Sequence, residues 1–283
     1  MPKGVESEKH KTGCYTNQFV ERDCAKARSP HFYVRSQMQQ WDLHHTYHLV
    51  ERVFGRDQVA LIKPCLRSVI DRQNFALYHI LETRRLLKSF KRKHLADKNL
   101  LVALHGARNP PARVPFEVLM INAGAHATAC VQAIHAISDI LAHGVYFATG
   151  LNLSAQPISD RDISINSVSA LVKRTPSLAN LADPVSRIAA GQQYEHLTAL
   201  SNLSKHRTII RTALSEDWTG KRKERYEFHF PAFSYTTKSG QKNYPEVSFA
   251  SLTKAEYDRL SFIVIEVGHE INAALTKQAR RSG

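Results

Sequence analysis

The segment YEHLTALSNLSKHRTIIRTAL, residues 194–214, has the apolar spacing of a helix that packs against other helices. Its apolar side chains recur every three or four residues over most of its length, which places them on one face of an α-helix. They are Leu197, Leu200, Leu203, Ile210 and Leu214. Arg207 stands where this row calls for another apolar residue, so either it is buried against a carboxylate or the helix breaks near it. We expect the rest of the chain to be organised around this helix.

A polar row runs beside the apolar one and holds the candidate catalytic residues. Glu195, Asn202 and His206 are seven and four residues apart, so they share one face of the helix. Lys205 and Arg207 flank His206. An imidazole that titrates near neutral pH, an amide and two cations suit an anionic ligand. The alternative is that His206 is a structural or solvated residue without a functional role.

A second polar row follows the apolar, alanine-rich segment at residues 114–151, which we predict to be a long helix. The row consists of Gln132, His135, Asp139, His143 and Tyr146. We expect it to face the row of Asn202 and His206 across one cleft. The cleft would be lined by His135, Asp139, His143, Glu195 and Ser201.

Two other interpretations of this second row stay open. The polar side chains can serve only to hydrogen-bond a packed helix, since buried polar groups need partners. They can also be metal ligands, because histidine and aspartate are suitable ligand types. However, His135 and His143 are two helical turns apart, about 12 Å, which is too far for His135, Asp139 and His143 to reach one ion. We therefore expect neither a metal nor another cofactor.

The remaining patterns predict a mainly α-helical bundle with a small antiparallel β-hairpin or ribbon inserted near residues 222–250. The strict alternation of Tyr226, Phe228 and Phe230 is typical of a strand, and a turn follows a few residues later. Elsewhere the apolar residues recur with helical spacing, so we expect one small sheet region in an otherwise helical protein.

Two helix boundaries can be predicted from local signals. The apolar period predicts a helix over residues 57–94, with a break near Pro64 because proline removes a backbone hydrogen bond. Thr253 and Glu256 have capping-box spacing, which predicts that the last helix begins there.

The chain is expected to contain three regions. Residues 1–35 are polar and unpatterned, so we interpret them as a loose N-terminal arm. The proline-rich segment GARNPPARVP, residues 106–115, is the clearest break in the chain. It separates a helical region at residues 36–108 from a larger helical domain with the β-hairpin at residues 109–283.

The composition indicates a globular protein with a basic surface. The 283 residues are 43% hydrophobic and 23% charged, and the net charge is +14. Such a charge favours an anionic partner such as nucleic acid. The four cysteines form no CxxC pair, which indicates free thiols in a reducing compartment. We see no signal peptide and no apolar run of membrane-spanning length, so we expect a cytoplasmic protein without a membrane partner.

Three segments together resemble the HEPN superfamily of all-helical domains. They are QAIHAISDILAH at residues 132–143, SNLSKHR at residues 201–207, and the long C-terminal helix. The resemblance covers residues 114–277. Many members of the superfamily are RNA-cleaving effectors of prokaryotic toxin and antiviral systems, so the resemblance implies an RNA-directed protein.

The family's active motif is an arginine, usually followed by a polar residue, with a histidine four to six positions after the arginine. Asn202 and His206 match the polar residue and the histidine, whereas Ser201 stands at the arginine position. Lys205 or Arg207 would then have to supply the missing cation. A second pair, Arg72 and His79 with six residues between them, matches the motif less well.

The resemblance implies a metal-independent endoribonuclease in which the RNA 2′-hydroxyl attacks the neighbouring phosphate and His206 transfers a proton. It also implies a homodimer and a possible antitoxin or other protein partner. The alternative is a catalytically degenerate HEPN-like module that acts through protein–protein interaction. A third interpretation is an unrelated enzyme or metal protein, with His44 and His48 as the simplest ligands.

Overall fold

The computed structural model describes residues 40–96, 98–237 and 240–281. Residues Trp41–Gly283 form one compact unit. The predicted boundary between residues 108 and 109 lies inside this unit, and the arm predicted at residues 1–35 lies outside the described residues.

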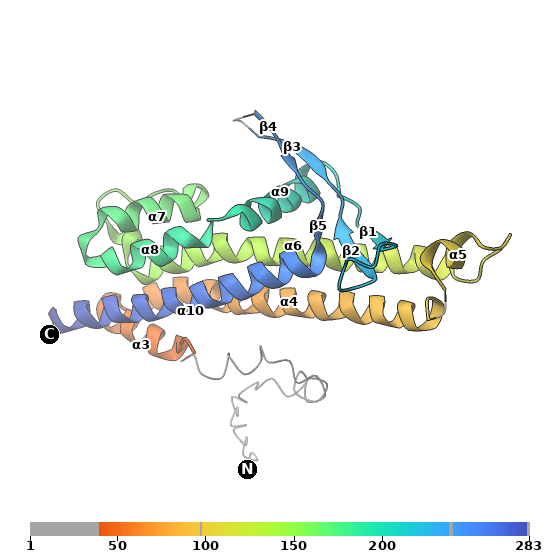
Figure 1. Cartoon of the computed structure of the whole chain (residues 1–283). Coiled ribbons are helices and arrows are strands. Elements are labelled where there is room, and N and C mark those ends of the chain that lie inside the picture. Colours follow the sequence, from red (N-terminus) through yellow and green to blue (C-terminus); the bar gives the residue numbers. More distant parts are fainter. Residues whose placement is uncertain (1–39, 97, 238–239, 282–283) are drawn as a thin grey trace, which may run out of the picture. The chain divides into compact units, whose positions relative to one another are not determined.

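The predicted fold class is confirmed, because helices make up 71% of the structure and the sheets are small. The described part of the chain contains eight α-helices: α3 (Leu43–Phe54), α4 (Arg56–His94), α5 (Leu100–His105), α6 (Arg113–Ala148), α7 (Ile165–Arg174), α8 (Ala179–Ile188), α9 (Gln192–His206) and α10 (Phe249–Arg281). Short 3-10 helices lie at Leu151–Leu153, Asp160–Asp162 and Pro176–Leu178. Figure 1 shows the long helices α4, α6 and α10 side by side.

The centre of the fold is the antiparallel pair of α4 and α6. The two helices are in close contact where Gly144 of α6 meets Leu66 of α4, since a Cβ atom on Gly144 would lie 2.7 Å from Leu66 Cδ2. Further along, Cys130 Sγ of α6 lies 3.7 Å from the carbonyl oxygen of Ala76. α6 is also long and apolar enough to cross a membrane, a composition that core helices of soluble proteins share.

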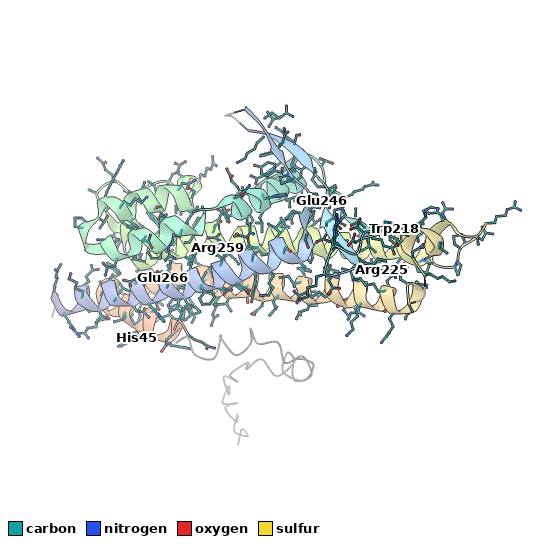
Figure 2. All side chains as sticks on the ribbon, in the orientation of Figure 1. His45, Trp218, Arg225, Glu246, Arg259 and Glu266 are labelled. Carbon is teal, nitrogen blue, oxygen red and sulfur yellow. The ribbon has the colours of Figure 1, made fainter. Side chains whose placement is uncertain are left out.

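Helix α10 packs against α4 and α6 and also contacts α3 and α8. At Gly268, a Cβ atom would lie 2.1 Å from Trp41 Cδ2, so α10 packs closely against Trp41, which lies just before α3. Arg259 of α10 donates hydrogen bonds to the carbonyl oxygens of Arg187 and Ile188, at 2.6 and 3.0 Å. These bonds join α10 to carbonyl groups in the last turn of α8, where intrahelical partners run out. Figure 2 shows Arg259 on the face of α10 that meets these elements.

The break predicted near Pro64 is wrong, because α4 continues through it. Pro64 is exposed, while Ile62 and Leu66 on either side are fully buried. A proline inside a helix costs about 3 kcal/mol, and each fully buried aliphatic side chain contributes about 1.5–3 kcal/mol. Packing against α6 over the whole length of α4 therefore outweighs the lost hydrogen bond.

The helix predicted at residues 194–214 ends earlier than its apolar spacing suggests. α9 stops at His206, and Arg207 adopts a non-helical conformation with φ −138° and ψ −66°. Leu214 is buried in a strand, opposite Phe228, rather than on the helix. The helix break considered at Arg207 is what the structure shows.

Two small antiparallel sheets follow α9, as predicted, but they begin before residue 222. The first is three-stranded in the order β1–β2–β5, and the second is the hairpin β3–β4. The strands are β1 (Ala213–Glu216), β2 (Tyr226–Phe230), β3 (Phe233–Thr237), β4 (Gly240–Tyr244) and β5 (Val247–Ser248). β2 confirms the strand predicted from the aromatic alternation, whereas β1 begins inside the segment predicted to be helical.

Candidate functional site

The C-terminal end of α9 presents the predicted catalytic residues to solvent. His206 is the last residue of the helix and is exposed, as are Lys205 and Arg207 beside it. Among the residues that the structure describes, no hydrogen bond, ion pair or ring contact engages the side chain of His206. Asn202, one turn earlier, is half-buried. The imidazole is thus free to meet a ligand from solution, next to two cations.

The hairpin β3–β4 lies along the predicted polar row of α9. The guanidinium of Arg207 lies 5.6 Å from the ring centroid of Tyr235 in β3, within the range of a cation–π contact. Glu195 forms an ion pair of 2.5 Å with Lys242 of β4. Glu195 therefore serves to attach the hairpin, and Arg207 is held in place by an aromatic ring rather than by a carboxylate.

A histidine that the sequence did not indicate anchors this hairpin. His196 is buried, with its ring centroid 5.4 Å from that of Phe233 and 5.2 Å from that of Tyr244. Phe233 and Tyr244 stack on each other at 4.9 Å. Burial lowers the pKa of His196, which favours the neutral ring in this packed position.

The polar row of α6 meets α9, but through other residues than Asn202 and His206. Gln132 donates a hydrogen bond of 2.9 Å to Ser204 Oγ. The ring of His135 is nearly parallel to that of Tyr194, with centroids 6.2 Å apart, and the Tyr194 hydroxyl donates to Ser138 Oγ at 2.6 Å. These contacts therefore belong to a packed interface between α6 and α9, which supports the helix-packing interpretation of this row.

The three residues considered as metal ligands on α6 do not converge. His135 is buried and Asp139 is exposed, while His143 Nδ1 donates a hydrogen bond of 2.9 Å to the backbone carbonyl of Asp139. Burial lowers the pKa of His135, the nearby Lys205 lowers it further, and Asp139 raises it. Across the described ranges, no group of three or more His, Cys, Asp and Glu side chains is placed to hold a metal ion.

Ser201, at the position of the family's arginine, is closed to solvent. Its exposed fraction is 0%, and its Oγ has no hydrogen-bond partner in the described part of the chain. A ligand at His206 would therefore be contacted by Lys205 or Arg207, not by a side chain at position 201.

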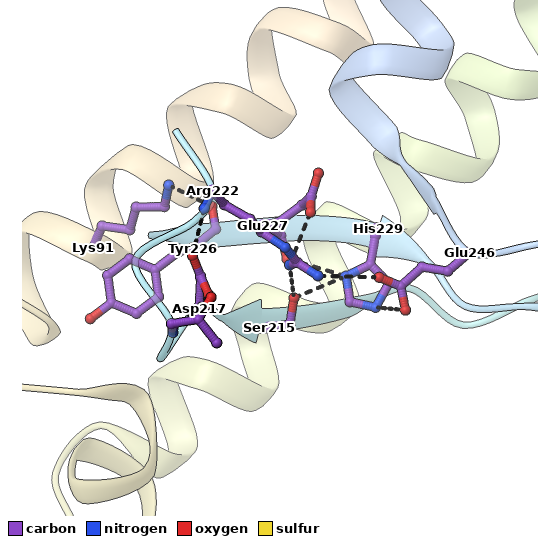
Figure 3. A network of polar contacts seen from close by, with 9 residues as sticks. Lys91, Ser215, Asp217, Arg222, Tyr226, Glu227, His229 and Glu246 are labelled. Carbon is purple, nitrogen blue, oxygen red and sulfur yellow. Dashed lines mark hydrogen bonds and ion pairs between the residues drawn. The ribbon is translucent and has the colours of Figure 1, made fainter. Parts of the chain in front are cut away.

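A second polar cluster, on β1 and β2, was not predicted (Figure 3). Ser215 Oγ of β1 lies 3.5 Å from His229 Nδ1 of β2. His229 Nε2 lies 3.5 Å from Glu246 Oε2. The guanidinium of Arg222 donates to Ser215 Oγ at 3.1 Å. A hydroxyl, an imidazole, a carboxylate and a guanidinium are thus joined in one chain of contacts.

The loop between β1 and β2 fixes Arg222 in this cluster. The carboxylate of Asp217 accepts hydrogen bonds from the backbone N–H and the hydroxyl of Thr219, at 2.9 and 2.7 Å, and from the backbone N–H of Arg222 at 2.7 Å. These bonds, with that of the Thr219 hydroxyl the largest contribution, lower the pKa of Asp217 to about 2. Arg222 also forms an ion pair of 3.0 Å with Glu227.

The sequence contained only part of the signal for this cluster. The alternation of Tyr226, Phe228 and Phe230 places His229 on the opposite face of β2 from Phe228 and Phe230. Ser215 could not be found in this way, because it directly follows a segment whose apolar spacing predicts a helix. Its approach to His229 depends on the pairing of β1 with β2.

A cavity of about 270 Å³ lies where α4, α5 and the start of α6 meet. Lys93, His94 and Lys98 contribute its described ionisable side chains, and alanine, valine, glycine and proline residues form the rest. The two lysines make this part of the surface positively charged, as the net charge of the chain leads one to expect.

The sequence matches no protein-family model, and no curated protein or solved structure is significantly similar to it.

Proposed function

We propose that this protein binds RNA at the C-terminal end of α9 and cleaves it without a metal ion. The observation that carries the proposal is the exposed His206, whose side chain is unengaged among the described residues, between the cations Lys205 and Arg207. An imidazole is the side chain best suited to proton transfer near neutral pH. The resemblance of residues 201–207 to the HEPN motif supports the same assignment.

The proposed reaction needs only groups present at this end of α9 and the RNA itself. The RNA 2′-oxygen forms a bond to the adjacent phosphorus, and the bond from phosphorus to the 5′-oxygen of the next nucleotide breaks. His206 takes the proton from the 2′-hydroxyl and passes it to the leaving 5′-oxygen, so no proton is gained or lost overall. Lys205 and Arg207 stabilise the charge on the phosphate oxygens. Glu195 takes no part, because it holds Lys242.

The buried Ser201 favours a second candidate, a helical module that binds partners without cleaving RNA. At the position where the family has its arginine, this chain has a small side chain with no access to solvent. If Lys205 and Arg207 do not replace that cation, the protein keeps a basic surface and loses the chemistry. Such a module would act through a protein partner.

Cleavage of a labelled total RNA pool in the presence of EDTA tests the proposal. We expect cleavage by the wild type and a loss of about 10²–10⁴-fold in rate for His206→Ala. The matched control is His45→Ala, an exposed helical histidine on α3 that Figure 2 shows well apart from α9. Equal rates for wild type and His206→Ala would overturn the assignment of His206, and absence of cleavage by both would favour the binding module.

A further inference from the structure

We propose that Ser215 is a nucleophile for acyl transfer, with His229 as its base, on the polar face of the β1–β2 sheet. The substrate class is a small carboxylic ester. This inference is independent of the RNA site, because it concerns other residues on other elements (Figure 3).

Strand pairing brings the reacting groups together. In the antiparallel register, Ser215 is opposite Glu227 and Ala213 is opposite His229. Side chains of directly paired residues lie on the same face of a sheet, and every second residue of a strand shares that face. Ser215, Glu227 and His229 therefore project from one face, while Leu214 and Phe228 are buried on the other.

The partners of His229 favour the tautomer that a base requires. An ionised Glu246 can only accept a hydrogen bond, so its oxygen 3.5 Å from Nε2 favours the tautomer that carries the proton on Nε2. Nδ1 is then unprotonated and can accept the proton of the Ser215 hydroxyl. The backbone carbonyl of Glu227 lies 3.3 Å from the same Nδ1 and can accept a hydrogen bond from it only in the opposite tautomer or in the doubly protonated ring. The site thus has partners for the ring before and after proton transfer.

Arg222 favours the ionised form of the serine oxygen. Its guanidinium donates to Ser215 Oγ at 3.1 Å, and a cation beside an ionisable oxygen stabilises the anion. The Asp217 loop and the ion pair with Glu227 hold Arg222 in place. The same guanidinium is positioned to stabilise negative charge that develops on a substrate oxygen.

The histidine of the cluster is buried, whereas its carboxylate and its serine can be reached from solvent. The His229 side chain is 7% exposed, whereas that of Glu246 is 48% exposed. Ser215 is half-buried, so its hydroxyl can be reached by a small molecule. The base is thus largely buried, and the exposed carboxylate beside it acts as a positioning residue.

The proposed reaction needs only Ser215, His229, the ester and water. Ser215 Oγ forms a bond to the acyl carbon, the bond from that carbon to the ester oxygen breaks, and the hydroxyl proton passes through His229 to the departing alcohol. Water then attacks the acyl-serine, His229 takes one of its protons and returns it to Ser215 Oγ as the acyl–oxygen bond breaks, and the acid is released.

Labelling with a fluorophosphonate probe measures the activation of this serine directly. Ser215 Oγ would bond to phosphorus, fluoride would leave, and His229 would take the proton. We expect mass spectrometry to locate the adduct on Ser215, at a rate at least about tenfold above that of the urea-unfolded protein. Ser215→Ala should abolish the adduct. The control Ser234→Ala, an exposed serine on β3, should leave the rate unchanged.

Glu246→Gln tests the triad even if replacement of the buried His229 prevents folding. We expect labelling to slow by about tenfold. Glu246→Asp keeps the carboxylate and should recover most of the labelling rate, whereas a purely structural role would not distinguish Asp from Gln. Labelling spread over several serines, or a rate of Glu246→Gln equal to that of wild type, would overturn the proposal.

Discussion

Gly144 marks the point where a single side-chain atom would disturb the central helix pair. A Cβ atom there would lie 2.7 Å from Leu66 Cδ2, and Leu66 is fully buried, so it has little room to move. At Gly124 on the same helix, the atom nearest to an added Cβ would be Thr212 Oγ1, at 3.2 Å. The two glycines therefore differ in what alanine would encounter, although both gain helix propensity from it.

We predict that Gly144→Ala lowers the free energy of unfolding by about 1–2 kcal/mol, since overpacking costs about 1–3 kcal/mol and the gain in helix propensity offsets up to about 1 kcal/mol. Gly124→Ala is the matched control and should be neutral or stabilising by up to about 1 kcal/mol. Urea unfolding of both variants measures the difference. A Gly144→Ala protein as stable as Gly124→Ala would contradict the close approach of α4 and α6.

At the residue scale, the sequence predicted which side chains share the end of α9 but not what they touch. Asn202, Lys205 and His206 lie on one helix, as their spacing indicated. The role of Glu195 depends on Lys242, which lies 47 residues further along the chain. Periodicity describes a residue's own helix, so contacts made by a distant hairpin could not be predicted from it.

At the element scale, the α4–α6 interface contains a histidine pair that makes its stability depend on pH. The Nδ1 atoms of His79 and His126 lie 2.8 Å apart, a distance at which one ring donates a hydrogen bond and the other accepts it. Burial lowers the pKa of His79, and His126 lowers it further. Tyr78 contacts both rings, and the nearby Glu82 is held by Arg85.

We predict that the free energy of unfolding falls as the pH drops from neutral to about 5. His79 has a lower pKa in the folded state than in the unfolded state, so its contribution is complete above the unfolded pKa and is lost as the pH falls through the folded pKa. His126→Gln removes the neighbouring imidazole that lowers the pKa of His79, so the loss should be smaller. Urea midpoints across this pH range provide the measurement, with the exposed His45→Gln as control. An unchanged pH dependence in His126→Gln would contradict this explanation.

The element boundaries show where local signals are insufficient. The capping-box pattern at Thr253 and Glu256 predicted the wrong start, because α10 already begins at Phe249 and the Thr253 hydroxyl donates to the Phe249 carbonyl inside the helix. Phe249 packs against Phe228 of β2, with ring centroids 5.7 Å apart. The burial of this aromatic ring against the sheet, which the local sequence does not reveal, accompanies the earlier start.

At the scale of the whole molecule, composition and periodicity were sufficient for the fold class. Long helical apolar periods and one short region of alternation predicted a helical protein with a small sheet, and that is what the structure shows. The net charge of +14 is consistent with an anionic partner but does not identify the site of binding. The basic groups at the end of α9 and around the α4–α5 corner are both candidates for contacts with RNA, and only the first has an exposed histidine between two cations.

The most direct test of the central claim is the chemistry of the RNA ends left by the purified protein in EDTA. If His206 promotes attack by the 2′-hydroxyl, mass spectrometry of a defined oligoribonucleotide should find 2′,3′-cyclic phosphate and 5′-hydroxyl ends, and His206→Ala should produce almost none. A substrate with a 2′-deoxy residue at the cleaved position should stay intact. Cleavage of that substrate, or the same ends at the same rate from His206→Ala, would contradict the account.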